Sequence, residues 1–477
     1  MDWGFDNTYA RDLPWLGAAM APVPVAEPTL LYLGAGLAEE LGLDPRWLAG
    51  PDGVRVLAGS SVPEGAEPLA QAYAGHQFGF FSPRLGDGRA HLLGEVVDRT
   101  GRRRDIALKG SGRTVFSRGG DGRAAIGPVL REVIVSEAMA ALGVPTTRAL
   151  AAAATGEQVW RDNGPERGAV LARVADSHLR VGTLELVRTQ GSTDQLRALV
   201  DYVRARHYPH LEPGDVWGLW DEIASRQAEL IAQWMSLGFI HGVMNTDNMA
   251  LSGETIDYGP CAFVDRYDPD TVYSSIDTAG RYRYSAQPSI AGWNLARLAE
   301  SLLPLAEGDP DAAVETATEL VGGFAGRYAV AFRVRMARKL GLAHVTDADE
   351  VDRLVGALLE TMRRRSLDFT GTFRALSRSL REGGAPDGLE DWVDAWRPLI
   401  ARPTETGEAM DAVNPAYIPR NHLVEEALDA AREGHLGPFE ELVGVLREPF
   451  VERPGLERYA EPAPERFAAT YVTFCGT

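Results

Sequence analysis

His241-Gly242-Val243-Met244-Asn245-Thr246-Asp247-Asn248 is followed, nine residues after Asn248, by Asp257-Tyr258-Gly259. This short stretch brings together amide and carboxylate side chains, which are hard oxygen ligands of the kind that Mg²⁺ or Mn²⁺ accepts beside phosphate groups. A carboxylate in the same place can also take up a proton. The stretch therefore predicts a site for a metal-bound nucleotide.

The spacing resembles the one found in kinase-fold phosphotransferases, where His-x-Asp-x-x-x-x-Asn forms the catalytic loop and Asp-Phe-Gly follows on a short strand. The histidine, Asn248 and Asp257 match that pattern. The usual position of the catalytic aspartate holds Val243 instead, and the nearest acid is Asp247. We expect Asn248 and Asp257 to bind the metal and Asp247 to act as the base, and the alternative for each is a turn-forming role.

The composition is that of an ordinary globular protein, with 45% hydrophobic and 24% charged residues. The net charge of −19 argues against a general nucleic-acid binder, which needs a basic surface. No stretch reaches the roughly 18 apolar residues of a membrane span, and the N-terminus lacks the features of a secretory signal. We therefore expect a cytoplasmic protein that binds neither membrane nor nucleic acid.

Lysine occurs only at Lys109 and Lys339, in a chain whose other cationic side chains are arginine or histidine. Lys109 ends a predicted strand and could bind phosphate while pairing with Glu132 on the next helix, although Glu137 is a rival partner. The segment 101–131 around Lys109 is rich in arginine, which suits an anionic ligand. The alternative is a surface lysine in a solvated loop.

Two glycine-rich segments flank this lysine, Gly86-Asp87-Gly88-Arg89 and Gly119–Arg123. Glycines let backbone N–H groups approach phosphates closely. Taken alone, the first segment is more typical of a hairpin turn and the second of a flexible loop. Arg173 follows an apolar strand, where an unpaired charge would be costly, and Arg180 is a further candidate for the anionic ligand.

The order of the elements predicts an α+β, protein-kinase-like bilobal fold. The expected units are an N-terminal extension (1–65), a β-rich N-lobe (66–182), a helical C-lobe (183–400) and a tail (401–477) with two short helices. The expected strands are 90–97 and 105–109 around a turn at Thr100-Gly101, then 148–153, 157–161, 168–174, 249–251, 255–257 and 262–264. The expected helices include 37–43, 128–142 and 217–238, and helices dominate after Pro288.

Further strings resemble the selenoprotein O family, a group of kinase-fold proteins, over nearly the whole chain. The strings include Tyr73-Ala74-Gly75-His76-Gln77-Phe78-Gly79, Leu108-Lys109-Gly110-Ser111-Gly112, Gly143-Val144-Pro145-Thr146-Thr147-Arg148 and Ile256-Asp257-Tyr258-Gly259-Pro260. The resemblance implies a protein adenylyltransferase that binds ATP in a flipped orientation. It implies that AMP passes to Ser, Thr or Tyr hydroxyls of target proteins, with Mg²⁺ or Mn²⁺ as cofactor.

The same resemblance implies roles for individual residues. The nucleotide would be bound by Gly86, Gly88, Arg89, Lys109, Asp121, Gly122, Arg173, Arg180 and Asp257. Asn248 and Asp257 would hold the metal, Asp247 would be the base, and Glu132 would pair with Lys109. Cys261 and Cys475 are the only cysteines. By themselves they are more typical of two reduced thiols, but the resemblance implies a redox-active disulfide between them.

Two other functions remain open at this level. One is an ordinary phosphotransferase, against which Val243 counts. The other is a pseudokinase that binds nucleotide without turnover.

Overall fold

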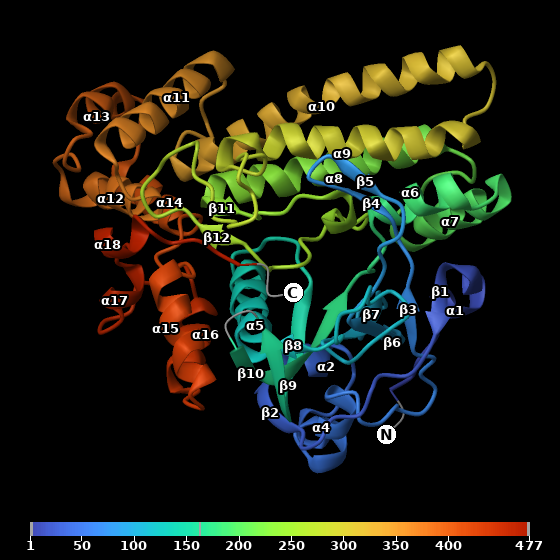
Figure 1. Ribbon diagram of the computed structural model, residues 1–477. Helices are drawn as coiled ribbons and strands as arrows, with labels where there is room; N and C mark the ends of the chain where they lie inside the picture. The colour runs from blue at the N-terminus through green and yellow to red at the C-terminus, as the bar shows by residue number, and fades with distance from the viewer. Residues whose placement is uncertain (1–2, 162–163, 475–477) are drawn as a thin grey trace.

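An antiparallel sheet forms the N-terminal part of the molecule, in the order β1-β3-β6-β7-β10-β9-β2, with β8 paired to β10. The computed structural model describes residues 3–161 and 164–474 (Figure 1). The strands of this sheet are β1 (Gly17–Ala19), β2 (Thr29–Leu33), β3 (Leu69–Gln71), β6 (Ala90–Val97), β7 (Arg103–Lys109), β8 (Ala124–Ala125), β9 (Arg148–Arg161) and β10 (Gly164–Ala175). The expected hairpin at Thr100-Gly101 is present as β6–β7, and Gly101 supplies the positive φ of its turn.

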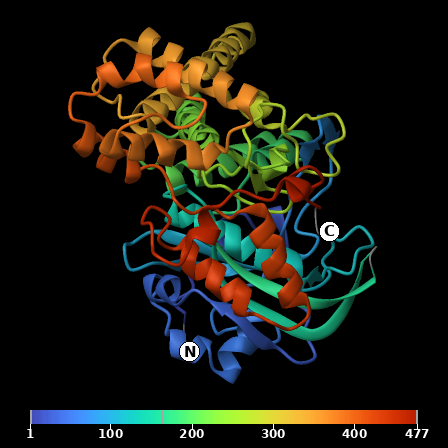
Figure 2. The same cartoon turned by 90° about the vertical axis from the view of Figure 1, so that its left-hand side faces the viewer.

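Helices cover both faces of this sheet. One face packs against α2 (Ala35–Glu40), α3 (Pro45–Leu48) and α4 (Pro51–Leu57). The other face packs against α5 (Ile126–Ala141), which is itself covered by α15 (Asn421–Arg432) and α16 (Gly437–Leu446). Figure 2 shows these C-terminal helices lying in front of the sheet, so the tail returns to the N-terminal half.

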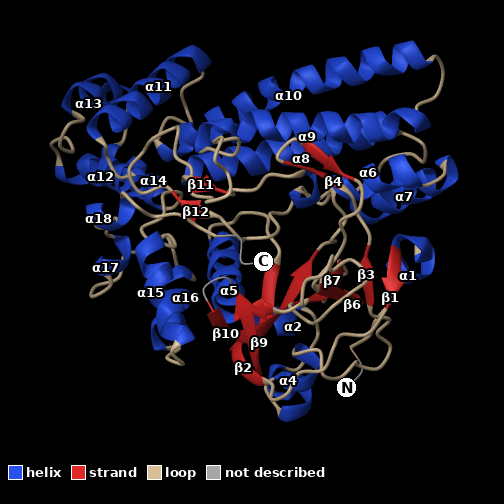
Figure 3. Cartoon of the chain, viewed as in Figure 1, coloured by secondary structure: helices blue, strands red, loops and turns tan. Residues whose placement is uncertain are grey.

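The rest of the chain is mostly helical (Figure 3). Its helices are α6 (Val181–Gln190), α7 (Thr193–His207), α8 (Val216–Leu237), α9 (Gln287–Leu302), α10 (Pro310–Lys339), α11 (Ala348–Arg365), α12 (Phe369–Glu382), α13 (Glu390–Trp396) and α14 (Pro403–Asp411). Other elements include α1 (Thr8–Asp12), α17 (Glu457–Ala460), α18 (Glu465–Ala468) and the short strands β4 (Gly75–Gln77), β5 (Phe80–Ser82), β11 (Phe239–Ile240) and β12 (Ala262–Phe263). The protein is thus a mixed α+β molecule, with a β-rich part followed by a helical part.

Local signals account for the ends of the helices that position the site. Asp215 caps α8 by accepting a hydrogen bond from the backbone N–H of Gly218 at 2.8 Å. Gly238 ends the same helix with φ +74°, a left-handed conformation that glycine adopts at little cost. The chain then turns directly into β11 and the predicted catalytic loop.

Several predicted elements differ in the structure. The strands expected at 148–153 and 157–161 are one strand, β9, because Gly156 (φ +72°) forms a bulge opposite β10 and does not end the strand. The strands expected at 249–251 and 255–257 are single bridges, from Ala250 to Arg180 and from Thr255 to Thr146. Short apolar segments that are buried in a loop have the same sequence pattern as a strand, although they do not pair with a neighbouring strand over several residues.

The two ends of the chain also hold more structure than their patterns indicated. The segment 1–65 contains α1 to α4 and contributes β1 and β2 to the main sheet. The segment 401–474 contains five helices where two were expected. In the part of the chain that the structure describes, no helix combines the length and the apolar character that crossing a membrane requires.

Candidate active site

The predicted catalytic loop is held rigidly by His241. The imidazole Nε2 lies 2.9 Å from the backbone oxygen of Ile256, and the backbone N–H of His241 donates to Oε1 of Gln287 at 3.0 Å. Burial lowers the pKa of His241, despite the bond to Ile256, so the ring is neutral near pH 7. His241 therefore ties the loop to the segment before Asp257 and to the first turn of α9.

Lys109 and Glu132 meet between the sheet and α5. The Lys109 Nζ lies 2.7 Å from Oε2 of Glu132 and 2.7 Å from Oδ1 of Asp257. Glu137, the rival partner, forms its ion pair with Arg148 instead, at 3.0 Å. Three residues from a strand, a helix and the loop after β11 thus converge on one point.

Two arginines complete this charged cluster. Nη1 of Arg173 lies 2.6 Å from Oδ1 of Asp257 and 3.1 Å from Oε1 of Glu132. Nη2 of Arg180 lies 3.8 Å from Oδ2 of Asp257, and its guanidinium lies over the ring of Tyr73, 4.3 Å from the centroid. Both arginines are buried. Arg180 also lies 3.8 Å from Asp87, so the three cations of the cluster face three carboxylates, and a phosphate could take the place of some of these partners.

Asp257 is the centre of the cluster and is held in an unusual backbone conformation. Burial opposes its ionisation, but the charges of Lys109, Arg173 and Arg180 outweigh this effect and hold its pKa well below the ordinary value. Its φ of +64° lies in the left-handed region, which non-glycine residues seldom occupy. Such backbone strain is concentrated at functional sites.

Asp247 lies in the same site in a different electrostatic environment. Burial raises its pKa to about 6, although the charge of Arg180 opposes the shift. One carboxylate oxygen, Oδ2, accepts a hydrogen bond from Nε2 of Gln77 at 3.2 Å. The other oxygen, Oδ1, is buried and has no hydrogen-bond donor among the residues that the structure describes. A buried acceptor without a donor is costly, so this oxygen is suited to a ligand that brings one.

Asn248 and Val243 explain how the loop differs from the kinase pattern. Nδ2 of Asn248 donates to the backbone oxygen of Val243 at 2.9 Å, which orients the amide carbonyl oxygen away from that bond. The Val243 side chain is buried in a large apolar core, and valine has no group that can carry a proton. The acid of this loop is therefore Asp247.

The donor chemistry fits a metal that is shared with phosphates. Within residues 3–161 and 164–474, no group of three or more His, Cys, Asp or Glu side chains is placed to hold a metal by itself. Asn248 and Asp257 supply one amide and one carboxylate group on the same loop. Mg²⁺ commonly binds one or two protein oxygens and takes its remaining ligands from phosphate and water.

The two glycine-rich segments each pack against residues 110–117, which follow Lys109. The backbone N–H of Gly110 donates to the carbonyl of Arg89 at 2.7 Å. A Cβ at Gly86 would lie 2.5 Å from the Phe116 ring, and one at Gly122 would lie 2.2 Å from the backbone of Gly112. Glycine is thus required at both positions by close approach, and Gly86–Gly88 is not a hairpin turn between paired strands.

Asp121 lies outside the charged cluster around Asp257. Its carboxylate is half exposed and pairs with Nη1 of Arg161 at 2.8 Å, at the tip of β9. The structure therefore places Asp121 at the outer end of the loop that begins at Lys109.

The C-terminal tail reaches the segment after Asp257. The hydroxyl of Thr473 donates to the backbone oxygen of Pro260 at 2.7 Å, and the backbone N–H of Thr473 donates to Tyr273 at 2.7 Å. Pro260 immediately precedes Cys261, which is fully buried. Cys475 lies outside the described residues.

Three residues of the site were missed by sequence reasoning. Gln77 holds Asp247, Asp87 lies 3.8 Å from Arg180, and His178 accepts a hydrogen bond from Nε of Arg173 at 3.2 Å. All three lie inside strings that carried the family resemblance or flanked a candidate residue. Their side-chain types gave no separate signal, because each acts through a partner that is distant in sequence or buried.

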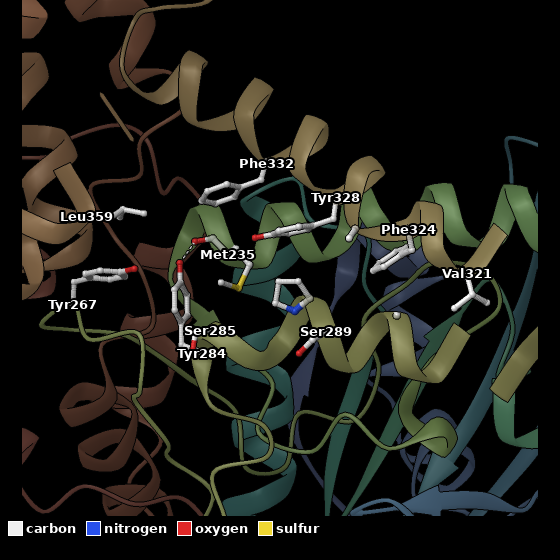
Figure 4. Close-up of a pocket in the computed structure, with 13 residues that line it drawn as sticks. Met235, Tyr267, Tyr284, Ser285, Ser289, Val321, Phe324, Tyr328, Phe332 and Leu359 are labelled. Carbon is white, nitrogen blue, oxygen red and sulfur yellow. Dashed lines mark hydrogen bonds between the residues drawn. The ribbon is translucent and has the colours of Figure 1, made fainter. Parts of the chain in front are cut away.

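A separate cavity of about 560 Å³ lies in the helical part between α8, α9, α10 and α11 (Figure 4). Phe324, Tyr328 and Phe332 of α10 line it, opposite Met235 and Tyr284. Among the residues that the structure describes, its lining includes no predicted site residue and no charged side chain. The cavity is therefore not where the charged cluster around Asp257 is located.

Comparison with known proteins yields one family. The family described as "Protein adenylyltransferase SelO" matches residues 18–447. A protein of Mycobacterium sp. (strain KMS), described as "Protein nucleotidyltransferase YdiU", is 55% identical over 482 residues, which cover 99% of each chain. Proteins with the same description are 54% identical in Cereibacter sphaeroides (strain ATCC 17023), covering 100% of each chain, and 54% identical in Rhodopseudomonas palustris (strain BisB5), covering 99% of each.

Proposed function

The chain belongs to the SelO family of protein adenylyltransferases, and from this we propose that it transfers AMP from ATP to hydroxyl side chains of other proteins. The observation that carries the proposal is Oδ1 of Asp247. This oxygen is buried and lacks a donor among the described residues, and it lies in the same site as the charged cluster around Asp257. A hydroxyl group is the donor that such an acceptor would bind.

A protein-kinase-like arrangement of the two halves supports the proposal. Lys109 ends a strand of the sheet, Glu132 lies on α5, and Asp257 follows the catalytic loop after α8. Nucleotide-binding kinases bring a strand lysine, a helix glutamate and a metal-binding aspartate together in the same way.

The flipped orientation of ATP explains why the acid has moved from position 243 to position 247. In that orientation the γ-phosphate lies near Lys109 and the α-phosphate faces Asp247. The acceptor hydroxyl then approaches a different phosphorus from the one that a kinase attacks. Gly86, Gly88, Arg89, Asp121 and Gly122 would bind the rest of the nucleotide.

The transfer itself would use Asp247 as the base and two arginines to stabilise the leaving group. Asp247 accepts the proton of the acceptor hydroxyl, and the hydroxyl oxygen attacks the α-phosphorus of ATP. The bond from that phosphorus to the oxygen that bridges it to the β-phosphate breaks, so AMP becomes joined to the protein and pyrophosphate leaves with the electron pair. Arg173 and Arg180 stabilise the charge that develops on the pyrophosphate.

Asn248 and Asp257 would hold the divalent cation. When bound, a Mg²⁺ or Mn²⁺ ion supplies neutralisation of phosphate charge in the transition state. The side chains themselves orient it: Asn248 is fixed by its bond to Val243, and Asp257 is kept ionised by the cations around it.

A disulfide between Cys261 and Cys475 would regulate the enzyme. Support comes from Thr473, whose hydroxyl bonds to Pro260 next to Cys261. Cys475 is two residues beyond Thr473 in the sequence.

The test uses ATP labelled separately at the α- and γ-phosphates, with divalent metal, thiol reductant and a cell lysate as the source of acceptors. Label in protein from the α position alone is the expected result. Label from the γ position alone would indicate a phosphotransferase with a displaced base. Bound ATP with no label from either position would indicate a pseudokinase.

A further inference from the structure

A small hairpin connects the active site to the protein surface. It consists of β4 and β5, residues 75–82, which pair only with one another among the described strands. Figure 3 shows it lying against the helical part, away from the main sheet. Its two-residue turn places Phe78 at φ +52° and Gly79 at φ +87°, as a tight hairpin turn requires. A phenylalanine in this region is unusual, so the surroundings must hold the turn in place.

The hairpin is fixed to the predicted catalytic loop by three consecutive residues. The backbone N–H of His76 donates to Oγ1 of Thr246 at 2.6 Å, and Nε2 of Gln77 donates to Oδ2 of Asp247 at 3.2 Å. The backbone N–H of Phe78 donates to Oδ1 of Asn245 at 3.1 Å. The position of the hairpin is therefore set by the same loop that carries the proposed base.

Phe80 extends from this hairpin into solvent. Its register partner is Gln77, and directly opposite residues of an antiparallel pair point to the same face with Cβ atoms about 5 Å apart. Phe80 thus lies on the face whose glutamine holds Asp247. Phe80 is 79% exposed, although burying an aromatic ring is favourable by roughly 2 kcal/mol.

The opposite face of the hairpin has its partners within the chain. There Nδ1 of His76 contacts Oε1 of Glu185, and the ring of His76 lies 5.0 Å from Phe81 and 5.2 Å from Trp293. On this face His76 is packed against the helices and Phe81 is 38% exposed, whereas on the face beside Asp247 Phe80 is far more exposed.

The outer edge of β5 has no strand partner among the described residues. In the part of the chain that the structure describes, β5 pairs on one side only, with β4. Edge strands carry backbone N–H and C=O groups that can pair with an extended peptide, and such pairing places the peptide side chains alternately on the two faces. A two-stranded hairpin gains stability from a third strand.

We propose that the hairpin 75–82 is the docking site for the acceptor polypeptide. The proposal rests on the function proposed above, because only a protein transferase needs to bring a polypeptide hydroxyl to Asp247. An extended segment of the acceptor pairs with β5 and packs an apolar or aromatic side chain on Phe80. The neighbouring serine, threonine or tyrosine then enters toward Oδ1 of Asp247. The site selects hydroxyl residues that have an apolar neighbour.

The test compares wild type with Phe80→Ala, a change at an exposed position that does not disturb the core. Trp160→Ala is the matched control, because Trp160 is 74% exposed and lies at the far end of β9. The probe is a library of decapeptides with a central serine, threonine or tyrosine and a flanking position fixed as phenylalanine or serine. Transfer is followed with α-labelled ATP, and binding is followed by fluorescence anisotropy of the fluorescein-labelled peptides.

Phe80→Ala is expected to lower kcat/KM for the phenylalanine-flanked peptides roughly tenfold or more, through KM, as truncation of an aromatic anchor does. The preference over serine-flanked peptides should disappear, while the affinity for ATP stays unchanged. The Trp160→Ala variant should keep the kcat/KM and the peptide preference of wild type. Equal peptide binding and equal preference in wild type and Phe80→Ala would overturn the docking site. Phe80-dependent peptide binding without any α-label transfer by wild type would support the docking site and overturn the adenylyltransferase proposal alone.

Discussion

The Nζ of Lys109 and Nη1 of Arg173 reach the same oxygen of Asp257, at 2.7 Å and 2.6 Å. Two cations from neighbouring strands thus share a single carboxylate oxygen. A nucleotide phosphate that enters this site would take over part of that pairing, since a phosphate offers several acceptor oxygens to the same cations.

Removal of the charge of Lys109 or of Asp257 should therefore strongly reduce AMP transfer. Lys109→Ala and Asp257→Asn are each expected to lower kcat/KM at least about 10²-fold, because the first removes a positive charge that acts on the phosphates and the second removes a carboxylate that would hold the metal. The measurement is incorporation of α-labelled AMP into protein. Asp194→Asn, at a carboxylate with 95% side-chain exposure on α7, should retain wild-type activity. Full activity in both site variants would disprove the assignment of the charged cluster.

Asp247→Asn tests the base separately from nucleotide binding. The amide cannot accept a proton, so kcat should fall by roughly 10² to 10⁴. ATP affinity, measured by calorimetry, should stay close to that of wild type, because Asp247 is not part of the charged cluster. If the variant turns over normally, the proton must go to another group.

His178 is expected to act as a positioning residue for Arg173. Nε of Arg173 donates to Nε2 of His178, and Nδ1 of His178 lies 3.0 Å from Oδ2 of Asp105. Burial lowers the pKa of His178 more than the bond to Asp105 raises it, so the neutral ring accepts from Arg173 with its second nitrogen.

His178→Ala should raise KM for ATP about tenfold, because it leaves the Arg173 guanidinium free to reorient. His178→Gln, whose amide oxygen can accept the same bond, should restore much of the affinity. His210→Ala, at an exposed histidine, is the control. If Gln rescues thermal stability but not the KM for ATP, the role of His178 is structural only.

The proposed disulfide between Cys261 and Cys475 predicts that the activity of the enzyme changes with thiol reductants. The activity of wild type should change on reduction, while Cys475→Ser and Cys261→Ser should be insensitive, because neither variant can form the disulfide. Activity is measured with α-labelled ATP before and after dithiothreitol. A wild-type enzyme that ignores the reductant would exclude the disulfide as a regulator.

The burial of Lys339 should make the stability of the folded protein depend on pH. This buried lysine lies 4.0 Å from the centroid of the Phe373 ring, and burial lowers its pKa to about 7. In the folded protein it loses its proton near pH 7, whereas in the unfolded chain it keeps the proton up to its ordinary value of 10.5. Its contribution to stability therefore rises with pH between about 7 and 10.5.

Lys339→Met should stabilise the protein at pH 6 to 7 and progressively less as the pH approaches 10. The effect is on the order of a few kcal/mol, and the cation–π contact with Phe373 offsets part of it. The measurement is the unfolding temperature at fixed scan rate across this pH range. Arg338→Met, at an exposed neighbour on α10, should show no such dependence. A difference between Lys339→Met and wild type that does not change with pH would contradict the prediction.

The sequence pattern predicted those helices and strands in which the spacing of apolar residues matches the face that the structure buries. The hairpin β6–β7, α5 and α8 form as expected because their apolar spacing and their turn or cap residues indicate the same structure. Gly156 was misinterpreted because a glycine in a strand pattern can either end a strand or form a bulge, and only the pairing with β10 decides between them. Two of the C-terminal helices, α15 and α16, bury their apolar faces against α5, a contact with a distant segment that their local pattern does not reveal.

The sequence by itself determined the family and the chemical inventory of the candidate site, since the motif spacing places Asp247, Asn248 and Asp257 on one loop whatever the rest of the chain does. Only the tertiary structure decided which side chains meet. Glu132 faces Lys109 while Glu137 faces Arg148, and Gln77 meets Asp247 across 170 residues of sequence. The reason is that backbone propensities act over a few residues, whereas a contact between distant segments depends on how whole elements pack against one another.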